Sequence, residues 1–234
     1  MNKAVDLDKK MVWGRLGIVT ILLLILIGPN FGPIPMTLRQ SFSLEGSIVG
    51  MLVWFWVAFS LVIIAILRLS SMSVRELLSY VGVGASSTIG ANIAGVIIGL
   101  LWAALFLTSI FQFDPDANII QISGFRILAA LLAGTGVVLE DIITRGWLMN
   151  QLRELQFPNW LQALASAVLF ALYHTAWAGF NIAAFIASLI FGLILAGLFL
   201  WGKRSLTPVI LAHSLAVLIS EPFASMMIFL TANL

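Results

Sequence analysis

The segment IAAFIASLIFGLILAGLFLW, residues 182–201, decides the fold class, because it is an apolar run without one charged side chain. A helix needs about 20 predominantly apolar residues to cross the hydrocarbon core of a bilayer. A helix that is apolar on all faces lies either deep inside a large protein or in lipid. The segment therefore predicts a membrane-spanning helix.

The composition extends this prediction to the whole chain. Of 234 residues, 61% are hydrophobic and 9% are charged, whereas ordinary globular domains have about 45–50% apolar and about 25% charged residues. We predict an all-α, polytopic helix bundle in which residues 1–234 form a single membrane domain. The absence of cysteine excludes disulfides and thiolate chemistry. The net charge of +2 is better explained by membrane topology than by a nucleic-acid partner, and membrane lipids are the expected surroundings.

Seven spans are predicted from apolar runs that short polar joints separate. They cover approximately residues 12–28, 47–67, 87–113, 124–150, 160–177, 182–201 and 206–230. Pro222 would divide the last run, which gives eight spans. Gly95 and Gly99 in the third run have the spacing that lets helix backbones approach closely in lipid. The stretch 73–78 before that run is expected to lie along the membrane interface.

The distribution of basic residues predicts a cytoplasmic amino terminus, as in a multi-pass protein of a prokaryotic inner membrane. Cytoplasmic joints tend to carry Lys and Arg. With this orientation the outer joints keep mainly Arg39 and Arg126, with Asp114 and Asp116. The inner joints hold Lys3, Lys9, Lys10, Arg15, Arg68, Arg75, Arg153, Lys203 and Arg204.

Three ionisable residues inside the spans are the candidate functional residues: Glu140, His174 and His213. An ionisable group costs at least about 2.5–3.5 kcal/mol at the bilayer centre, so it persists where it faces a bundle interior or a wet cavity. At a rise of about 1.5 Å per residue they lie about 15, 21 and 12 Å from the cytoplasmic ends of their spans. We expect them to meet in one cavity that opens to the cytoplasm. Hydrogen-bonded packing histidines are the alternative.

Local spacing suggests roles for the neighbouring residues. Asp141 and Arg145 are i,i+4 neighbours on one helix face, which favours an ion pair. Glu140 is turned about 100° away from Asp141 and can point at another helix. Phe170 lies one turn before His174 and can pack against its imidazole. The alternative for Glu140 to Arg145 is a solvated cytoplasmic helix end.

These residues, in this order, resemble a known family. The patterns Glu140-Asp141-x-x-x-Arg145, Phe170-x-x-x-His174 and a last motif at His213 resemble the CPBP family of intramembrane proteases, which is also called the Abi or CAAX-protease-like family. The resemblance covers residues 124–221. Asp141 replaces the usual second Glu. Val217 replaces the usual Asn or Asp four residues after the last histidine. If the family uses that residue to stabilise the oxyanion, this chain either lacks the donor or replaces it with Ser214, Ser220 or Asn181.

The resemblance implies an intramembrane endopeptidase that hydrolyses a peptide bond with water activated by Glu140. It implies His174 and His213 as catalytic partners, and a peptide or lipid-modified protein as substrate. Glu140, His174 and His213 would also suit a catalytic zinc, as in a metalloprotease, so the sequence leaves a zinc and a metal-free mechanism open. Two other classes stay open: a non-proteolytic membrane scaffold with a degenerate site, which Val217 favours, and a small transporter.

Overall fold

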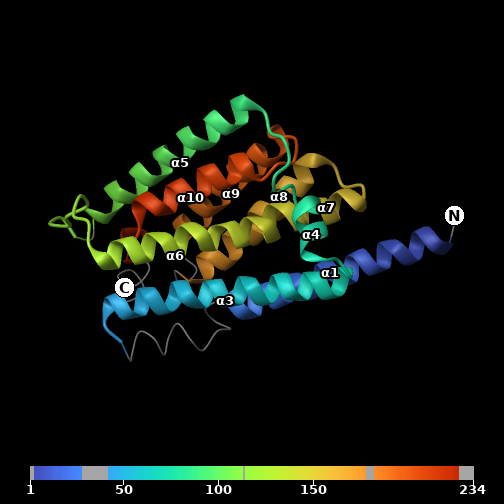
Figure 1. Ribbon diagram of the computed structural model, residues 1–234, viewed down its shortest axis with the longest axis horizontal. Coiled ribbons are helices and arrows are strands. Elements are labelled where there is room, and N and C mark those ends of the chain that lie inside the picture. Colours follow the sequence, from blue (N-terminus) through green and yellow to red (C-terminus); the bar gives the residue numbers. More distant parts are fainter. Residues whose placement is uncertain (1–2, 28–41, 113, 178–181, 227–234) are drawn as a thin grey trace.

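The computed structural model describes residues 3–27, 42–112, 114–177 and 182–226, and its elements there are helices, as predicted. Figure 1 shows most of them running side by side along the length of the molecule. Their order is α1 (Lys3–Ile27), α3 (Leu44–Ser70), α4 (Val74–Tyr80), α5 (Ile89–Ile110), α6 (Gly124–Asp141), the π-helix η1 (Ile142–Trp147), α7 (Leu148–Glu154), α8 (Asn159–Trp177), α9 (Ile182–Trp201) and α10 (Thr207–Ser220).

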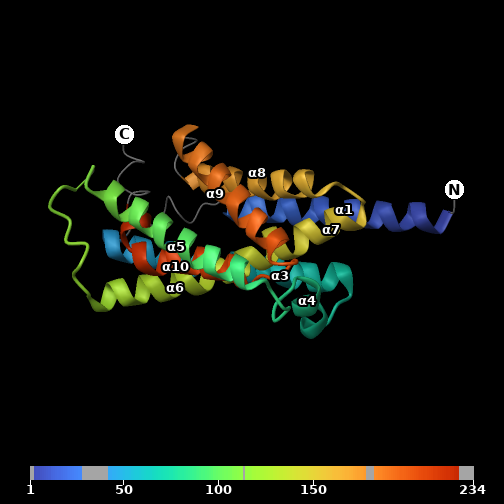
Figure 2. The same ribbon diagram turned by 90° about the horizontal axis from the view of Figure 1, so that it is seen from above.

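The lengths and apolar character of the helices agree with the multi-pass membrane protein that the composition predicts. Five stretches are long and apolar enough to cross a bilayer: Lys9–Ile27, Leu44–Ser70, Ile89–Ile110, Gly124–Glu154 and Ile182–Trp201. α10 is apolar but shorter. α8 and α10 lie in the places of the predicted fifth and seventh spans and run alongside the others (Figures 1 and 2).

The last helix is shorter than the predicted span 206–230. α10 ends at Ser220, and Glu221 has an extended backbone with φ −74° and ψ 145°. The ring of Pro222 disfavours a helical conformation at the residue before it, which explains the break. Residues 227–230 of the predicted span, and with them the choice between seven and eight spans, lie outside the described residues.

α10 packs closely against α5, because glycines on α5 leave room for its backbone. A Cβ atom on Gly95 would lie 2.4 Å from the carbonyl oxygen of Pro208, and one on Gly99 would lie 2.7 Å from that of Ala212. The spacing of these glycines thus has the packing role that the sequence predicts. Since α10 also carries His213, this contact fixes the position of a candidate site residue.

We expect the Gly95→Ala variant to lower the stability of the folded protein, because backbone atoms of α10 cannot yield as a side chain can. Overpacking costs about 1–3 kcal/mol. Gly197→Ala on α9 is the matched control, since its Cβ would meet nothing within 4 Å and Ala favours a helix by about 1 kcal/mol over Gly. Thermal unfolding in detergent should move in opposite directions for the two variants. Equal shifts would contradict the close contact.

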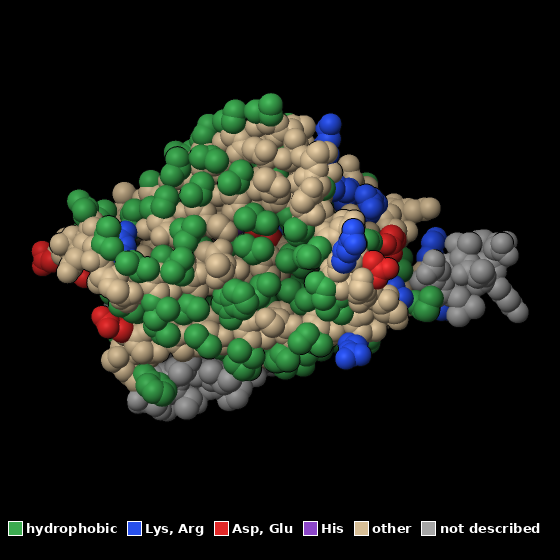
Figure 3. All heavy atoms as spheres, viewed as in Figure 1, with side chains coloured by type: hydrophobic (Ala, Val, Ile, Leu, Met, Phe, Trp, Pro, Cys, Tyr) green, Lys and Arg blue, Asp and Glu red, His purple; other side chains and the backbone are tan. Residues whose placement is uncertain are grey.

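Charged side chains gather at the ends of the molecule, and apolar side chains cover much of the face between them (Figure 3). The end that carries α4 and α7 has most of the Lys and Arg side chains in this view. It includes Arg68 in the last turn of α3 and Arg153 in the last turn of α7. The bundle therefore has one basic end, as expected for a protein oriented by its loop charges.

Candidate active site

A change of helix type begins directly after the two acidic residues of α6. The six residues of η1 form a π-helix, in which hydrogen bonds join residues five apart. This wider turn brings Arg145 beside both acids: its Nη1 lies 3.1 Å from Oδ1 of Asp141 and 3.5 Å from Oε1 of Glu140. The predicted Asp141–Arg145 ion pair is confirmed. The approach of Arg145 to Glu140 is an addition that i,i+4 spacing did not predict.

Glu140 points at another helix, as its helical position allows, and that helix is α8. Its Oε1 accepts a hydrogen bond from the hydroxyl of Tyr173, and both side chains are buried. The burial excludes the solvated helix end that remained as an alternative, because Asp141 and Arg145 are fully buried as well. A buried carboxylate is stable only when a cation and a hydrogen-bond donor contact it, and here these are Arg145 and Tyr173.

His213 connects α10 to α6. Its Nδ1 lies 3.2 Å from Oδ2 of Asp141, and the imidazole is buried. Asp141 is therefore more than the ion-pair partner that the sequence suggests, because it contacts both Arg145 and a candidate catalytic histidine. A carboxylate on Nδ1 orients an imidazole and directs its Nε2 toward a reacting group.

His174 lies one turn after Phe170 on α8, and its Nδ1 is 3.0 Å from the carbonyl oxygen of Phe170. The Phe170 ring packs on the imidazole at a centroid distance of 4.0 Å, which confirms the predicted contact. The same ring lies 5.7 Å from the imidazole of His213 and 4.2 Å below the guanidinium of Arg145. Phe170 is thus the apolar centre on which the two histidines and the arginine meet.

The structure brings the sequence-predicted residues into one cluster from α6, η1, α8 and α10. Glu140 and His174 are linked through Tyr173, which donates to the carboxylate and whose ring lies 4.7 Å from the imidazole. Phe191 of α9 closes the cluster beside His213 at a centroid distance of 5.4 Å. The acid and the two imidazoles thus belong to one contact network in the described residues, while the expected cavity open to the cytoplasm stays a prediction.

Tyr173 is the site residue that the sequence analysis missed. The chain has only two tyrosines, and a phenol in an apolar span needs a hydrogen-bond partner. This need for a partner, together with the position of Tyr173 next to His174, is the feature of the sequence that could have indicated a site residue. Its partner could not be identified from the sequence, because Glu140 and Tyr173 lie on different helices.

The position that usually holds an Asn or Asp carries no polar group here. Val217 packs against the apolar core. Of the substitutes considered, the Ser214 hydroxyl donates to the carbonyl of Gly134 at 2.9 Å, and Asn181 lies outside the described residues. Ser220 has a buried hydroxyl without a partner in the described structure, but it is seven residues from His213, about 10 Å along the helix. The unpartnered donors inside the cluster are Nε and Nη2 of Arg145.

The geometry of the cluster bears on the zinc site that the resemblance left open. Within the part of the chain that the structure describes, there is no group of three His, Cys, Asp or Glu side chains arranged to hold an ion. Glu140 instead faces Tyr173 and Arg145, and Nδ1 of His213 faces Asp141. These contacts occupy Oε1 of Glu140 and Nδ1 of His213, and no step is assigned to a metal. Zinc dependence stays an untested prediction.

Comparison with known families supports the resemblance that the motifs predict. Residues 121–219 match the family model described as Rce1-like, type II CAAX prenyl endopeptidase Rce1-like. This segment is thus similar to the CAAX-protease family. It begins just before α6 and ends within one residue of the end of α10, so it contains every residue of the cluster. The chain matches neither a curated protein nor a solved structure.

Proposed function

We propose that the protein is an intramembrane endopeptidase in which Glu140 activates the attacking water. The observation that carries the proposal is the cluster in which a buried carboxylate, a buried imidazole and a half-buried one converge from three helices, in a segment that matches the model of a prenyl endopeptidase family. A buried carboxylate close to imidazoles is a suitable general base, since a positioned base contributes about 10²–10⁴-fold to a rate.

The hydrogen bonds of the histidines support their roles. If Nδ1 of His174 donates to the Phe170 carbonyl and Nδ1 of His213 donates to Asp141, both rings present Nε2 as an acceptor. In this state an Nε2 atom can accept a hydrogen bond from one O–H of a water whose other O–H points at Glu140. Glu140 then takes a proton from that water as its oxygen attacks the carbonyl carbon of the scissile peptide.

The remaining steps need a proton donor and a positive charge. The protonated Glu140 or an imidazolium passes the proton to the leaving amine, so that the C–N bond breaks and a new carboxyl and amino terminus form. Arg145 supplies positive charge beside the site, and two of its nitrogens, Nε and Nη2, have no hydrogen-bond partner in the described structure. We propose that it stabilises the tetrahedral oxyanion in the absence of a polar residue at Val217.

The family description suggests the substrate class. Members are named as prenyl endopeptidases of CAAX proteins, so we propose a peptide or lipid-modified protein whose cleaved bond lies close to the membrane. The basic end of the bundle (Figure 3) supports an orientation with this end and the amino terminus in the cytoplasm. The substrate would then enter from the cytoplasmic side.

One observation favours a second candidate, a membrane scaffold that retains the fold. Val217 removes a hydrogen-bonding side chain from the last motif, and loss of one oxyanion donor costs about 10²–10³-fold in rate. A scaffold would tolerate alanine at all three candidate residues, provided that the variant inserts. A comparison of peptide termini separates the two functions.

The test compares membranes from cells that carry the wild type with membranes from cells that carry a triple variant with Ala at Glu140, His174 and His213. A peptidase predicts new termini that occur only with the wild type, and these termini identify its substrate. Identical termini, with equal amounts of both proteins in the membrane, would favour the scaffold.

We expect Tyr173→Phe to reduce peptide cleavage by about 10- to 100-fold, because a hydrogen bond to a charged group contributes about 1.5–3 kcal/mol. The phenol holds the carboxylate of Glu140 in place. Tyr80→Phe is a closely matched control, since the Tyr80 hydroxyl donates to Oε1 of Glu154 at 2.7 Å outside the cluster. Initial cleavage rates should fall only in the Tyr173 variant. Similar rates for both variants would exclude a positioning role for Tyr173.

A further inference from the structure

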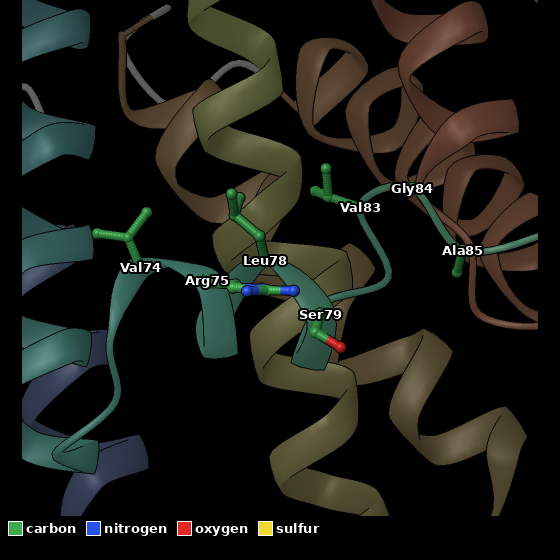
Figure 4. Close-up of a pocket in the computed structure, with 7 residues that line it drawn as sticks. All are labelled: Val74, Arg75, Leu78, Ser79, Val83, Gly84 and Ala85. Atoms are coloured by element: carbon green, nitrogen blue, oxygen red, sulfur yellow. The ribbon is translucent and has the colours of Figure 1, made fainter.

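A cavity of about 620 Å³ lies beside α4, away from the proposed active site. Its lining comes from α4 and from the loop that leads to α5, and it includes Val74, Arg75, Leu78, Ser79 and Val83. Figure 4 shows Leu78 and Val83 pointing to the same side, while the side chain of Arg75 lies along the helix toward Ser79. The cavity thus combines an apolar wall with a cation and a hydroxyl.

Arg75 is available to bind an anion. It is exposed and forms no ion pair within the described residues. Its acidic neighbour Glu76 is engaged elsewhere: Oε2 accepts from the backbone N–H and from the hydroxyl of Ser73, both at 2.7 Å. These hydrogen bonds also lower the pKa of Glu76. The carboxylate that could neutralise Arg75 is therefore committed to the start of α4.

The loop that forms the other wall is held in place by the turn between α9 and α10. Leu206 donates its N–H to the carbonyl of Gly82 at 3.1 Å, and the Ser205 hydroxyl donates to the carbonyl of Ala85 at 2.8 Å. Gly82 has a φ of 85°, and a Cβ atom on it would lie 2.0 Å from the carbonyl oxygen of Arg204. These contacts with residues 204–206 hold the loop wall of the cavity in position.

The position of the cavity suggests its ligand. α4 lies at the basic end of the bundle, beside the end of α3 (Figures 1 and 3). Val74 in the lining and Ile89 at the start of α5 are 61% and 78% exposed. Exposed apolar side chains beside basic ones are typical of the membrane interface, and basic pockets there bind the head groups of anionic lipids.

We propose that this cavity binds one anionic glycerophospholipid. The phosphate accepts hydrogen bonds from the guanidinium of Arg75 and from the hydroxyl of Ser79. A guanidinium can bind two phosphate oxygens in a bidentate contact. The start of the acyl chains lies against Leu78 and Val83. A free phosphate ion would use the cation but would gain nothing from the apolar wall, so the pairing of the two favours a lipid.

The test measures lipid binding by the purified full chain in detergent. Native mass spectrometry would compare phosphatidylglycerol with phosphatidylcholine of the same acyl chains, and a parallel thermal-shift experiment would use inorganic phosphate. We expect phosphatidylglycerol to bind about tenfold more tightly than phosphatidylcholine and to raise the unfolding temperature, since a ligand of the folded state stabilises it. Inorganic phosphate should have no comparable effect at the same concentration.

The variant Arg75→Gln should lose most of the preference for phosphatidylglycerol, and Ser79→Ala should lose part of it. Arg68→Gln is the matched control, because Arg68 is also an exposed arginine at the basic end but does not line the cavity. Equal binding of the two lipids would overturn the proposal. So would an equal loss in both arginine variants, which would indicate diffuse attraction, or a phosphate effect equal to that of the lipid, which would indicate a free-anion site.

Discussion

Glu140→Gln should reduce the rate of peptide cleavage by about 10²–10⁴-fold while leaving the helix bundle folded, because Gln keeps the shape of the side chain and removes the base. The amide oxygen of Gln can still accept the hydrogen bond from Tyr173. The loss should therefore appear in the rate of the chemical step. The measurement is single-turnover cleavage by the purified protein, with a substrate identified from the membrane termini.

Glu221→Gln is the control for this variant. Glu221 is a second buried glutamate, 5% exposed, whose Oε2 accepts from the N–H of Ser225 at 3.2 Å. It lies outside the cluster of Glu140, and a Gln amide oxygen can replace its contact. We expect its cleavage rate to stay within about twofold of wild type, as for substitutions without a mechanism of damage. Wild-type cleavage by Glu140→Gln would exclude the assigned base.

The fold could be predicted because membrane helices leave a strong signal in one dimension. A run such as residues 182–201 predicts a span without knowledge of its neighbours, and it forms α9 with the same limits. Gly95 and Gly99 predict a close helix contact for the same reason, since only their small size is needed. Their partner, α10, was not predictable, because spacing in one helix does not select the helix that packs on it.

The candidate site was predictable as a set of residues but not as a set of contacts. Glu140, His174 and His213 could be selected because each ionisable group in lipid is costly and must share a polar interior. The contact of Asp141 with His213 depends on how α6 and α10 are rotated against one another. The π-helix that follows Asp141 depends on the same packing, because no local residue pattern in 142–147 requires it.

The second large effect is expected from Arg145→Met, which should lower the free energy of unfolding by about 3–5 kcal/mol, the usual loss when one partner of a buried ion pair is removed. The guanidinium is fully buried, contacts Asp141 at 3.1 Å and Glu140 at 3.5 Å, and lies over the Phe170 ring. Met retains much of the apolar contact with Phe170, so the loss measures mainly the charge. Unfolding by denaturant in mixed micelles provides the measurement.

A double-variant comparison makes the charge explanation specific. Arg145→Met leaves two carboxylates without a cation, and adding Asp141→Asn removes one of them. The double variant should therefore lose about 1–3 kcal/mol less stability than the sum of the two single losses. Arg68→Met is the surface control, and it should change stability by less than about 1 kcal/mol because Arg68 is exposed. Strict additivity of the two losses would mean that Arg145 does not hold this acid pair. The acids would then need another source of positive charge, and His213, whose Nδ1 lies 3.2 Å from Asp141, is the nearest ionisable partner that the structure offers.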